Sequence, residues 1–120
     1  MANPSTGFGG AGTEVLRRGY GSNMSNTEIT LLTGLANHIY TVLSIIFKER
    51  SGGDELIHMW VDADLSGTDI YLLHSEPIGA NKVFVWNDRF VITETDKLNA
   101  KCAAATSIDV WISYIDQQLA

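Results

Sequence analysis

Apolar and polar residues alternate along several short stretches of the chain, and residues 38–47, HIYTVLSIIF, carry the strongest such pattern. Read with a period of two, they divide into one side with Ile39, Thr41, Leu43, Ile45 and Phe47 and another with His38, Tyr40, Val42, Ser44 and Ile46. A helix would spread the apolar residues all round its axis, whereas β-branched and aromatic side chains suit a pleated strand. We therefore expect a central strand that buries its first side.

Further strand patterns recur about every ten residues, at 13–20, 28–33, 56–62, 70–74, 82–92 and 107–116. The turn-forming sequence DADLSGTD joins two of them and predicts a hairpin, and residues 82–92 form either two short strands or one strand with a bulge. No segment of convincing length has a helical pattern. The fold class is therefore all-β, an antiparallel β-sandwich of the jelly-roll or immunoglobulin-like type with an extended N-terminal arm.

The terminal strand alternates strictly, with Ile108, Val110, Ile112 and Tyr114 on one side. We expect this side, or the opposite one, to pack against residues 38–47 and form the core between two sheets. Tyr40, Val42 and Ile46 on the second side of the central strand are too apolar for a solvated surface. Either more of the chain or another subunit must cover them, so we predict that they bind a partner.

Glycines are concentrated near the N-terminus, and we divide the chain there. Residues 1–26 are expected to form a flexible glycine-rich arm with a possible edge strand, and residues 27–120 the β-sandwich domain. Gly7, Gly9 and Gly12 match the spacing of a dinucleotide fingerprint, but no strand precedes them and no helical pattern follows. Phe8, an aromatic residue among these glycines, is the expected anchor of the arm on a partner.

Composition narrows the possible partners. The 120 residues suit one domain, and the net charge of −6, with no long basic cluster, opposes binding to nucleic acid. The single cysteine, Cys102, excludes an internal disulfide and a cysteine-rich zinc site. The longest apolar run is too short to span a membrane, and the N-terminus does not resemble a secretory signal, so we expect synthesis in a host cytoplasm.

Asp62, Asp64, Ser66 and Gly67 resemble the first half of a calcium-binding loop. Leu73 occupies the position where that loop has a bidentate glutamate, and the flanking segments are strands. We favour a hairpin turn with side-chain hydrogen bonds and keep a weak calcium site at Asp62, Asp64 and Ser66 as the alternative.

No constellation for catalysis emerges, and we expect neither enzymatic activity nor a cofactor. The three histidines, His38, His58 and His74, have no metal-ligand spacing and are expected to be separate and half-buried. The tryptophans Trp60, Trp86 and Trp111 all lie inside strand patterns. They fit the core or a subunit interface better than a platform for stacking sugars.

Three stretches of the sequence carry a resemblance to a known group of proteins: LANHIYTVLSIIFKERSG, DELIHMWVDADLSGTDIYLLH and KVFVWNDRFVITETDKLNAKCAAATSIDVWISYID. Over roughly residues 28–116 the chain resembles small β-sandwich virion structural proteins of tailed bacteriophages, of the capsid decoration, cement, neck or tail accessory type.

The resemblance implies a virion location and no catalytic residues. We expect a capsid decoration or cement protein that forms homo-oligomers and binds the major capsid protein or other virion subunits. The alternatives are a glycan-recognition module of a tail or fibre, and an adaptor of the neck or tail.

Overall fold

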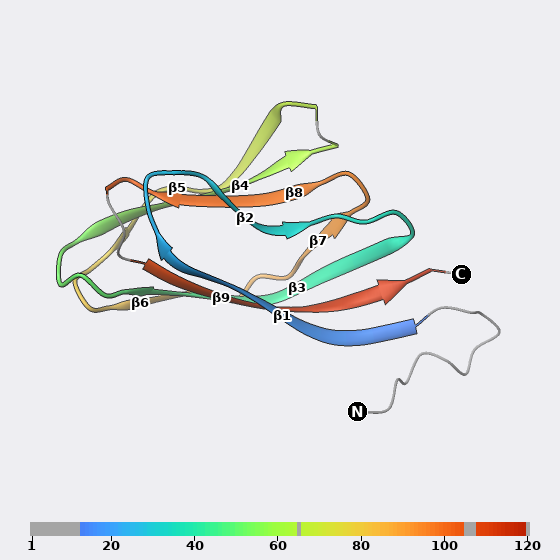
Figure 1. Cartoon of the computed structure of the whole chain (residues 1–120), viewed down its shortest axis with the longest axis horizontal. Coiled ribbons are helices and arrows are strands. Elements are labelled where there is room, and N and C mark those ends of the chain that lie inside the picture. The colour runs from blue at the N-terminus through green and yellow to red at the C-terminus, as the bar shows by residue number, and fades with distance from the viewer. Residues whose placement is uncertain (1–12, 65, 105–107, 120) are drawn as a thin grey trace.

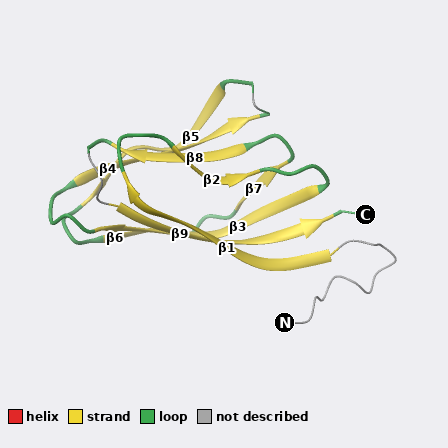
Figure 2. Ribbon diagram, viewed as in Figure 1, coloured by secondary structure: helices red, strands yellow, loops and turns green. Residues whose placement is uncertain are grey.

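The computed structural model describes residues 13–64, 66–104 and 108–119, which form nine β-strands and no helix (Figures 1 and 2). The strands are β1 (Thr13–Met24), β2 (Ile29–Thr33), β3 (His38–Glu49), β4 (Glu55–Ala63), β5 (Thr68–Ile78), β6 (Val83–Trp86), β7 (Phe90–Thr93), β8 (Lys97–Cys102) and β9 (Ile108–Gln118). The described residues therefore include no helix that could cross a membrane.

The strands form two antiparallel sheets packed face to face (Figure 1). The first sheet has the order β1-β9-β3-β6, with β7 also paired to β3, and the second has the order β2-β8-β4-β5. If β6 and β7 are counted as two halves of one strand along β3, eight strands divide equally between the sheets, which is the jelly-roll arrangement. The predicted all-β sandwich is confirmed, and residues 82–92 form two short strands.

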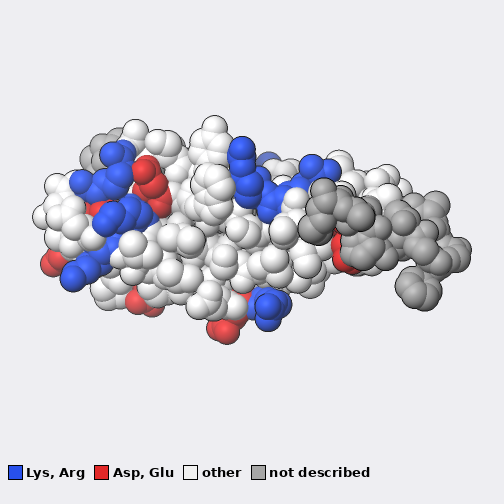
Figure 3. All heavy atoms as spheres, turned by 90° about the horizontal axis from the view of Figure 1, so that it is seen from below, with Lys and Arg blue, Asp and Glu red and all other residues white. Residues whose placement is uncertain are grey.

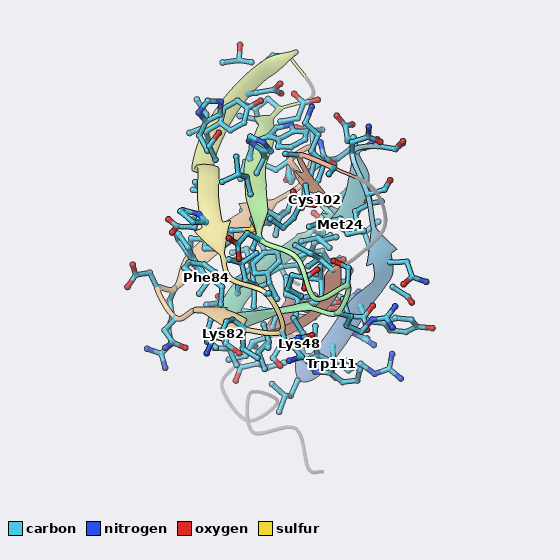
Figure 4. The ribbon with its side chains drawn as sticks, turned by 90° about the vertical axis from the view of Figure 1, so that its left-hand side faces the viewer. Met24, Lys48, Lys82, Phe84, Cys102 and Trp111 are labelled. Carbon is cyan, nitrogen blue, oxygen red and sulfur yellow. The ribbon has the colours of Figure 1, made fainter. Side chains whose placement is uncertain are left out.

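The core lies between the sheets, and Figure 4 shows Met24 and Cys102 within it. Val42, Ile45 and Phe47 of β3 have no exposed surface. The second sheet supplies side chains that are equally buried, among them Ile57, Met59, Leu98 and Ala100. Burying side chains of this size contributes roughly 1.5–3 kcal/mol each, so this layer dominates the stability of the fold.

A bulge in β3 makes the predicted division of this strand wrong. Val42 pairs with Tyr114 and Ser44 pairs with Ser113, so Leu43 is an extra residue without its own partner on β9. Because one extra residue reverses the alternation, Tyr40 and Val42 face the core before the bulge. Ile45 and Phe47 face it afterwards.

The position of the terminal strand also differs from the expectation. Ile108, Val110 and Ile112 are buried as predicted, and Tyr114 packs against the core. However, β9 forms hydrogen bonds with β3 in the same sheet, so the two strands do not face each other across the core. The strands that face β9 belong to the second sheet.

The carboxylate of Glu49 is fully buried at the end of β3 and organises the next turn. It accepts hydrogen bonds from the Ser51 hydroxyl and from the backbone N–H groups of Ser51, Gly52 and Asn81, at 2.6–3.2 Å. The Ser51 hydroxyl and these N–H groups outweigh the effect of burial and lower the pKa of Glu49 to about 2. The charge is thus retained in the folded protein by its donors.

Asp116, a nearly buried residue of β9, joins three strands of the first sheet. Its carboxylate accepts a hydrogen bond from Arg17 Nε of β1 at 2.8 Å and lies 2.6 Å from His38 Nδ1 of β3. Burial and the charge of Asp116 raise the pKa of neighbouring Tyr40. The polar groups of this cluster are hydrogen-bonded to one another, so we assign the cluster a structural role.

Candidate functional site

The outer side of the first sheet, which points away from the core, is unusually apolar. Among the described residues, seven of the thirteen exposed large apolar side chains lie there. We call this surface the apolar face and define it by Leu16, Tyr20, Ile46, Val83, Val85, Val91 and Trp111. Since an exposed apolar cluster on a folded protein marks an interaction site or an aggregation liability, it is the leading candidate for a functional surface.

Strand pairing aligns the apolar face into a continuous row. Tyr20 of β1 pairs with Trp111 of β9, Trp111 also pairs with Ile46 of β3, and Ile46 pairs with Val85 of β6. Their exposed fractions are 66%, 46%, 39% and 44% for Tyr20, Trp111, Ile46 and Val85. The row therefore crosses four strands at one level and presents only apolar or aromatic side chains.

Within this row, Tyr20 and Trp111 contact each other through their aromatic rings. Their rings stack with centroids 6.2 Å apart and an angle of 20° between their planes. The guanidinium carbon of Arg18 lies 5.5 Å from the centre of the Tyr20 ring and 5.3 Å from that of Trp111. Cation–π contacts of this kind hold both rings in place, so the aromatic pair is pre-ordered for binding.

A hollow of about 350 Å³ lies beside this pair, lined by Tyr20, Gly21, Ser22, Ile46, Lys48, Asp109, Val110 and Trp111. Figure 3 views this side of the molecule and shows a band without charges between groups of Lys and Arg, with Asp and Glu among them. Figure 4 shows Lys48 and Trp111 on the same outer side of the first sheet. The apolar surface is therefore bordered by charged groups of both signs.

The structure separates the four predicted partner-binding residues. Ile46 is exposed and belongs to the apolar face. Tyr40 and Val42 are 8% and 0% exposed because the bulge turns them inward; their cover comes from the chain itself, which corrects the inference that a partner covers them. Phe8 lies outside the described residues.

Sequence reasoning missed most of the apolar face. The signal for Trp111 was present, because it lies between Val110 and Ile112 of β9 and must point outward if these two residues point inward. Tyr20 and Leu16 alternate in the same way along β1. What the sequence did not reveal was that these strands are neighbours.

The three tryptophans have different environments. Trp60 is only 3% exposed and lies beside Tyr71, with ring centroids 5.4 Å apart. Trp86 is half-buried, and its Nε1 donates a hydrogen bond to the Asp88 carbonyl at 2.7 Å. Trp111 is therefore the tryptophan with a ring accessible for stacking on a ligand or partner.

The proposed calcium-binding residues serve the β4–β5 turn. Asp62 Oδ1 accepts a hydrogen bond from the Gly67 backbone N–H at 3.2 Å, and the Ser66 hydroxyl donates to a carbonyl of the turn at 2.7 Å. The Asp64 carboxylate accepts from the Thr95 hydroxyl at 3.3 Å. Within the described part of the chain, no group of three or more His, Cys, Asp or Glu residues is placed to hold a metal ion.

The sequence predicted three separate histidines, but two of them lie side by side. His58 and His74 lie together on the outer side of the second sheet, with ring centroids 5.3 Å apart. The Ser75 backbone N–H donates to His58 Nδ1 at 3.2 Å, and burial, His74 and Lys101 lower the pKa of His58. The lowered pKa and the hydrogen bond accepted by Nδ1 both favour the neutral form of His58.

Cys102 is fully buried as a free thiol, as expected of a small core residue. Burial and the nearby Glu55 carboxylate raise the pKa of Cys102 to about 11. A thiol with these properties is a poor nucleophile at neutral pH.

A scan against protein-family models finds no match. A search of curated protein sequences also finds none.

Solved structures with the same fold do exist. One is a chain from the study "Bacillus endospore appendages form a novel family of disulfide-linked pili", with a TM-score of 0.58, 16% identity and coverage of 99% of this chain and 100% of that one. Another is from the acid-stable capsid of Helicobacter pylori bacteriophage KHP30, with a TM-score of 0.54, 9% identity and 86% coverage of each chain. A pentameric capsid protein from metagenomic phage sequences is less similar, with a TM-score of 0.45, 14% identity and coverage of 86% of this chain and 61% of that one. At these identities the two likenesses with TM-scores above 0.5 show the fold alone, a β-sandwich shared with a chain from a study of pili and a chain from a phage capsid.

Proposed function

We propose that this chain is a structural protein of a virus particle, specifically a capsid decoration or cement protein of a tailed bacteriophage. The observation that carries the proposal is the apolar face, a four-strand row of exposed apolar side chains with a pre-ordered aromatic pair. The fold shared with a phage capsid chain supports it. The apolar face would contact the major capsid protein or another subunit of the shell.

Such a protein acts by contact alone. A ligand that binds the assembled shell and not its separated subunits stabilises the shell by its binding free energy. Icosahedral or cyclic symmetry repeats this contribution at every equivalent site. A modest affinity per copy is therefore sufficient.

The predicted arm of residues 1–26 is not one unit, because Thr13–Met24 form β1 of the first sheet. Residues 1–12, with Phe8 as an anchor, are proposed to extend the contact to a neighbouring subunit. Deletion of residues 1–12 is expected to leave the sandwich folded and to lower occupancy on the particle. Unchanged occupancy would count against this role.

The location is tested by counting copies in purified particles with quantitative mass spectrometry. Hundreds of copies per particle are expected for a protein of the shell, whereas a ring of the neck or tail holds on the order of six or twelve. Absence from the particles would overturn the virion proposal, and a ring-like number would favour the adaptor.

The binding surface is tested with a matched pair of variants, Trp111→Ser and Leu35→Ser. Leu35 is as exposed as Trp111, at 51% against 46%, but lies in the connection between β2 and β3. Trp111→Ser is expected to weaken binding to shells that lack the wild-type chain by roughly 30-fold, the effect of losing an aromatic anchor. Leu35→Ser should bind normally, and equal binding by both variants would exclude the apolar face.

A second candidate function is recognition of a host glycan by a tail or fibre. The stacked, exposed Tyr20 and Trp111 rings favour it, because sugar rings stack on such surfaces. Binding of the wild-type chain to a glycan array, lost in Trp111→Ser, would support this function. If the chain binds no glycan on the array, this function is excluded and the aromatic pair is assigned to a protein interface.

A further inference from the structure

The exposed edges of the two sheets differ in how well they are protected. A free edge strand offers unpaired N–H and C=O groups, and proteins usually blunt it by shortness, proline or bulges. On the second sheet, β2 has only five residues, and β5 contains Pro77 and pairs with β4 through two register shifts. On the first sheet, β6 and β7 have four residues each.

β1 lacks these devices. It is twelve residues long, contains no proline, and pairs with β9 without a register shift from Thr13 to Gly21. No described strand pairs with its other side, which forms the lower border of the sandwich in Figure 1. Val15 and Leu16, at 38% and 57% exposed, add apolar surface to this open edge. Such an edge is a template for another strand.

The sequence of β1 is complementary to itself in one antiparallel register. If Leu16 of one copy lies opposite Leu16 of a second copy, Glu14 lies opposite Arg18, and this pair occurs twice by symmetry. All four charged side chains and both leucines then lie on the outer side of the sheet, because residues directly opposite share a face. Neighbouring registers lose this match: a shift that centres on Arg17 or Arg18 places like charges opposite each other.

We propose that β1 is a self-pairing edge through which two copies of this chain form an antiparallel dimer centred on Leu16. Seven residues of each copy, Thr13–Gly19, pair in this register. Glu14 also interacts within its own chain, and a carboxylate accepts from more than one donor. In the dimer, the first sheet of one copy continues into the first sheet of the other, and the apolar face doubles in area. The shell subunit proposed to bind that face would then meet a larger surface.

Charge exchange tests this pairing without any shell. Glu14→Arg places two arginines opposite each other at both pairs, and Arg18→Glu places two glutamates there, so each variant alone should dimerise at least about tenfold more weakly than the wild type. A mixture of the two variants restores opposite charges by pairing one variant with the other. We expect analytical ultracentrifugation to show dimers for the wild type, for the mixture and for the double variant, and monomers for each single variant.

The outcomes that overturn the proposal are specific. Most specific interfaces have dissociation constants below about 100 μM. A wild-type chain that stays monomeric at that concentration excludes the dimer. Single variants that dimerise like the wild type, or a mixture that fails to recover, exclude this register. Far-ultraviolet circular dichroism of each variant separates loss of pairing from loss of fold.

A cross-link gives an independent measure. Leu16→Cys should form a disulfide-linked dimer on oxidation, because residues opposite each other in antiparallel strands lie within disulfide reach. Val91→Cys, which is 51% exposed on the same face but at the other edge, is the control and should remain monomeric. Trp111→Ser should dimerise normally, so failure of shell binding and failure of self-pairing are distinguished.

Discussion

Deletion of Leu43 is the sharpest test of the bulge in β3. Val42 and Ser44, on either side of it, already pair with consecutive residues of β9. Without Leu43 the strand therefore alternates regularly, and the residues before and after position 43 keep their present sides. The core residues of both halves of the strand stay buried.

The cost of deleting Leu43 is that of its own half-buried side chain, about 1 kcal/mol. Deletion of Ile46, in the regular second half of the strand, is different. Its cheapest arrangement absorbs the bulge, turns Ile45 outward and puts Ser44 in its place. Ile45 is now 0% exposed, and exposing a side chain of this size costs roughly 1.5–3 kcal/mol. This is a large share of the roughly 5–15 kcal/mol that stabilises a typical domain.

Urea unfolding followed by tryptophan fluorescence measures both losses as lower midpoints. Leu43→Ala is the matched control, because it keeps the bulge and removes only part of a half-buried side chain, at a cost of about 1 kcal/mol. The Leu43 deletion should unfold close to this control, and the Ile46 deletion at a lower urea concentration. If the Leu43 deletion is the less stable of the two deletions, the bulge does not set the side of each residue and the reasoning is refuted.

Three further predictions concern single positions. The pKa of Glu49 is about 2 in the folded protein and near 4.5 in the unfolded chain. The contribution of its charge to stability is therefore present above the unfolded pKa and is lost as pH falls towards the folded pKa. In urea titrations between about pH 5 and pH 2, Glu49→Gln should lose less stability than the wild type. Gly34→Ala places a Cβ 2.4 Å from the Glu94 carbonyl oxygen and should lower the free energy of unfolding by about 1–3 kcal/mol, whereas Gly53→Ala, with its nearest atom at 3.7 Å, should change it little. Cys102, fully buried with a pKa of about 11, should resist iodoacetamide at about pH 8 in the native protein and react once urea unfolds it, and rapid native labelling would contradict its burial.

Local alternation determined the strands and much of the burial before any tertiary structure was considered. The side of β9 with Ile108, Val110 and Ile112 is buried as its pattern predicts, and the turn between β4 and β5 falls where DADLSGTD predicts it. Both follow from the period of two in a strand and from the conformational preferences of turn residues, which act between neighbours in the sequence.

Only the tertiary structure decided which strands are neighbours and where alternation reverses. Leu43 is apolar like the residues around it, so the sequence of β3 contains no sign of the bulge, which forms where pairing with β7 gives way to pairing with β6. Likewise, Tyr20 and Trp111 are ninety-one positions apart in the sequence, and only the pairing of β1 with β9 stacks them. The apolar face depends on contacts between distant segments, and so it could be recognised only in the folded chain.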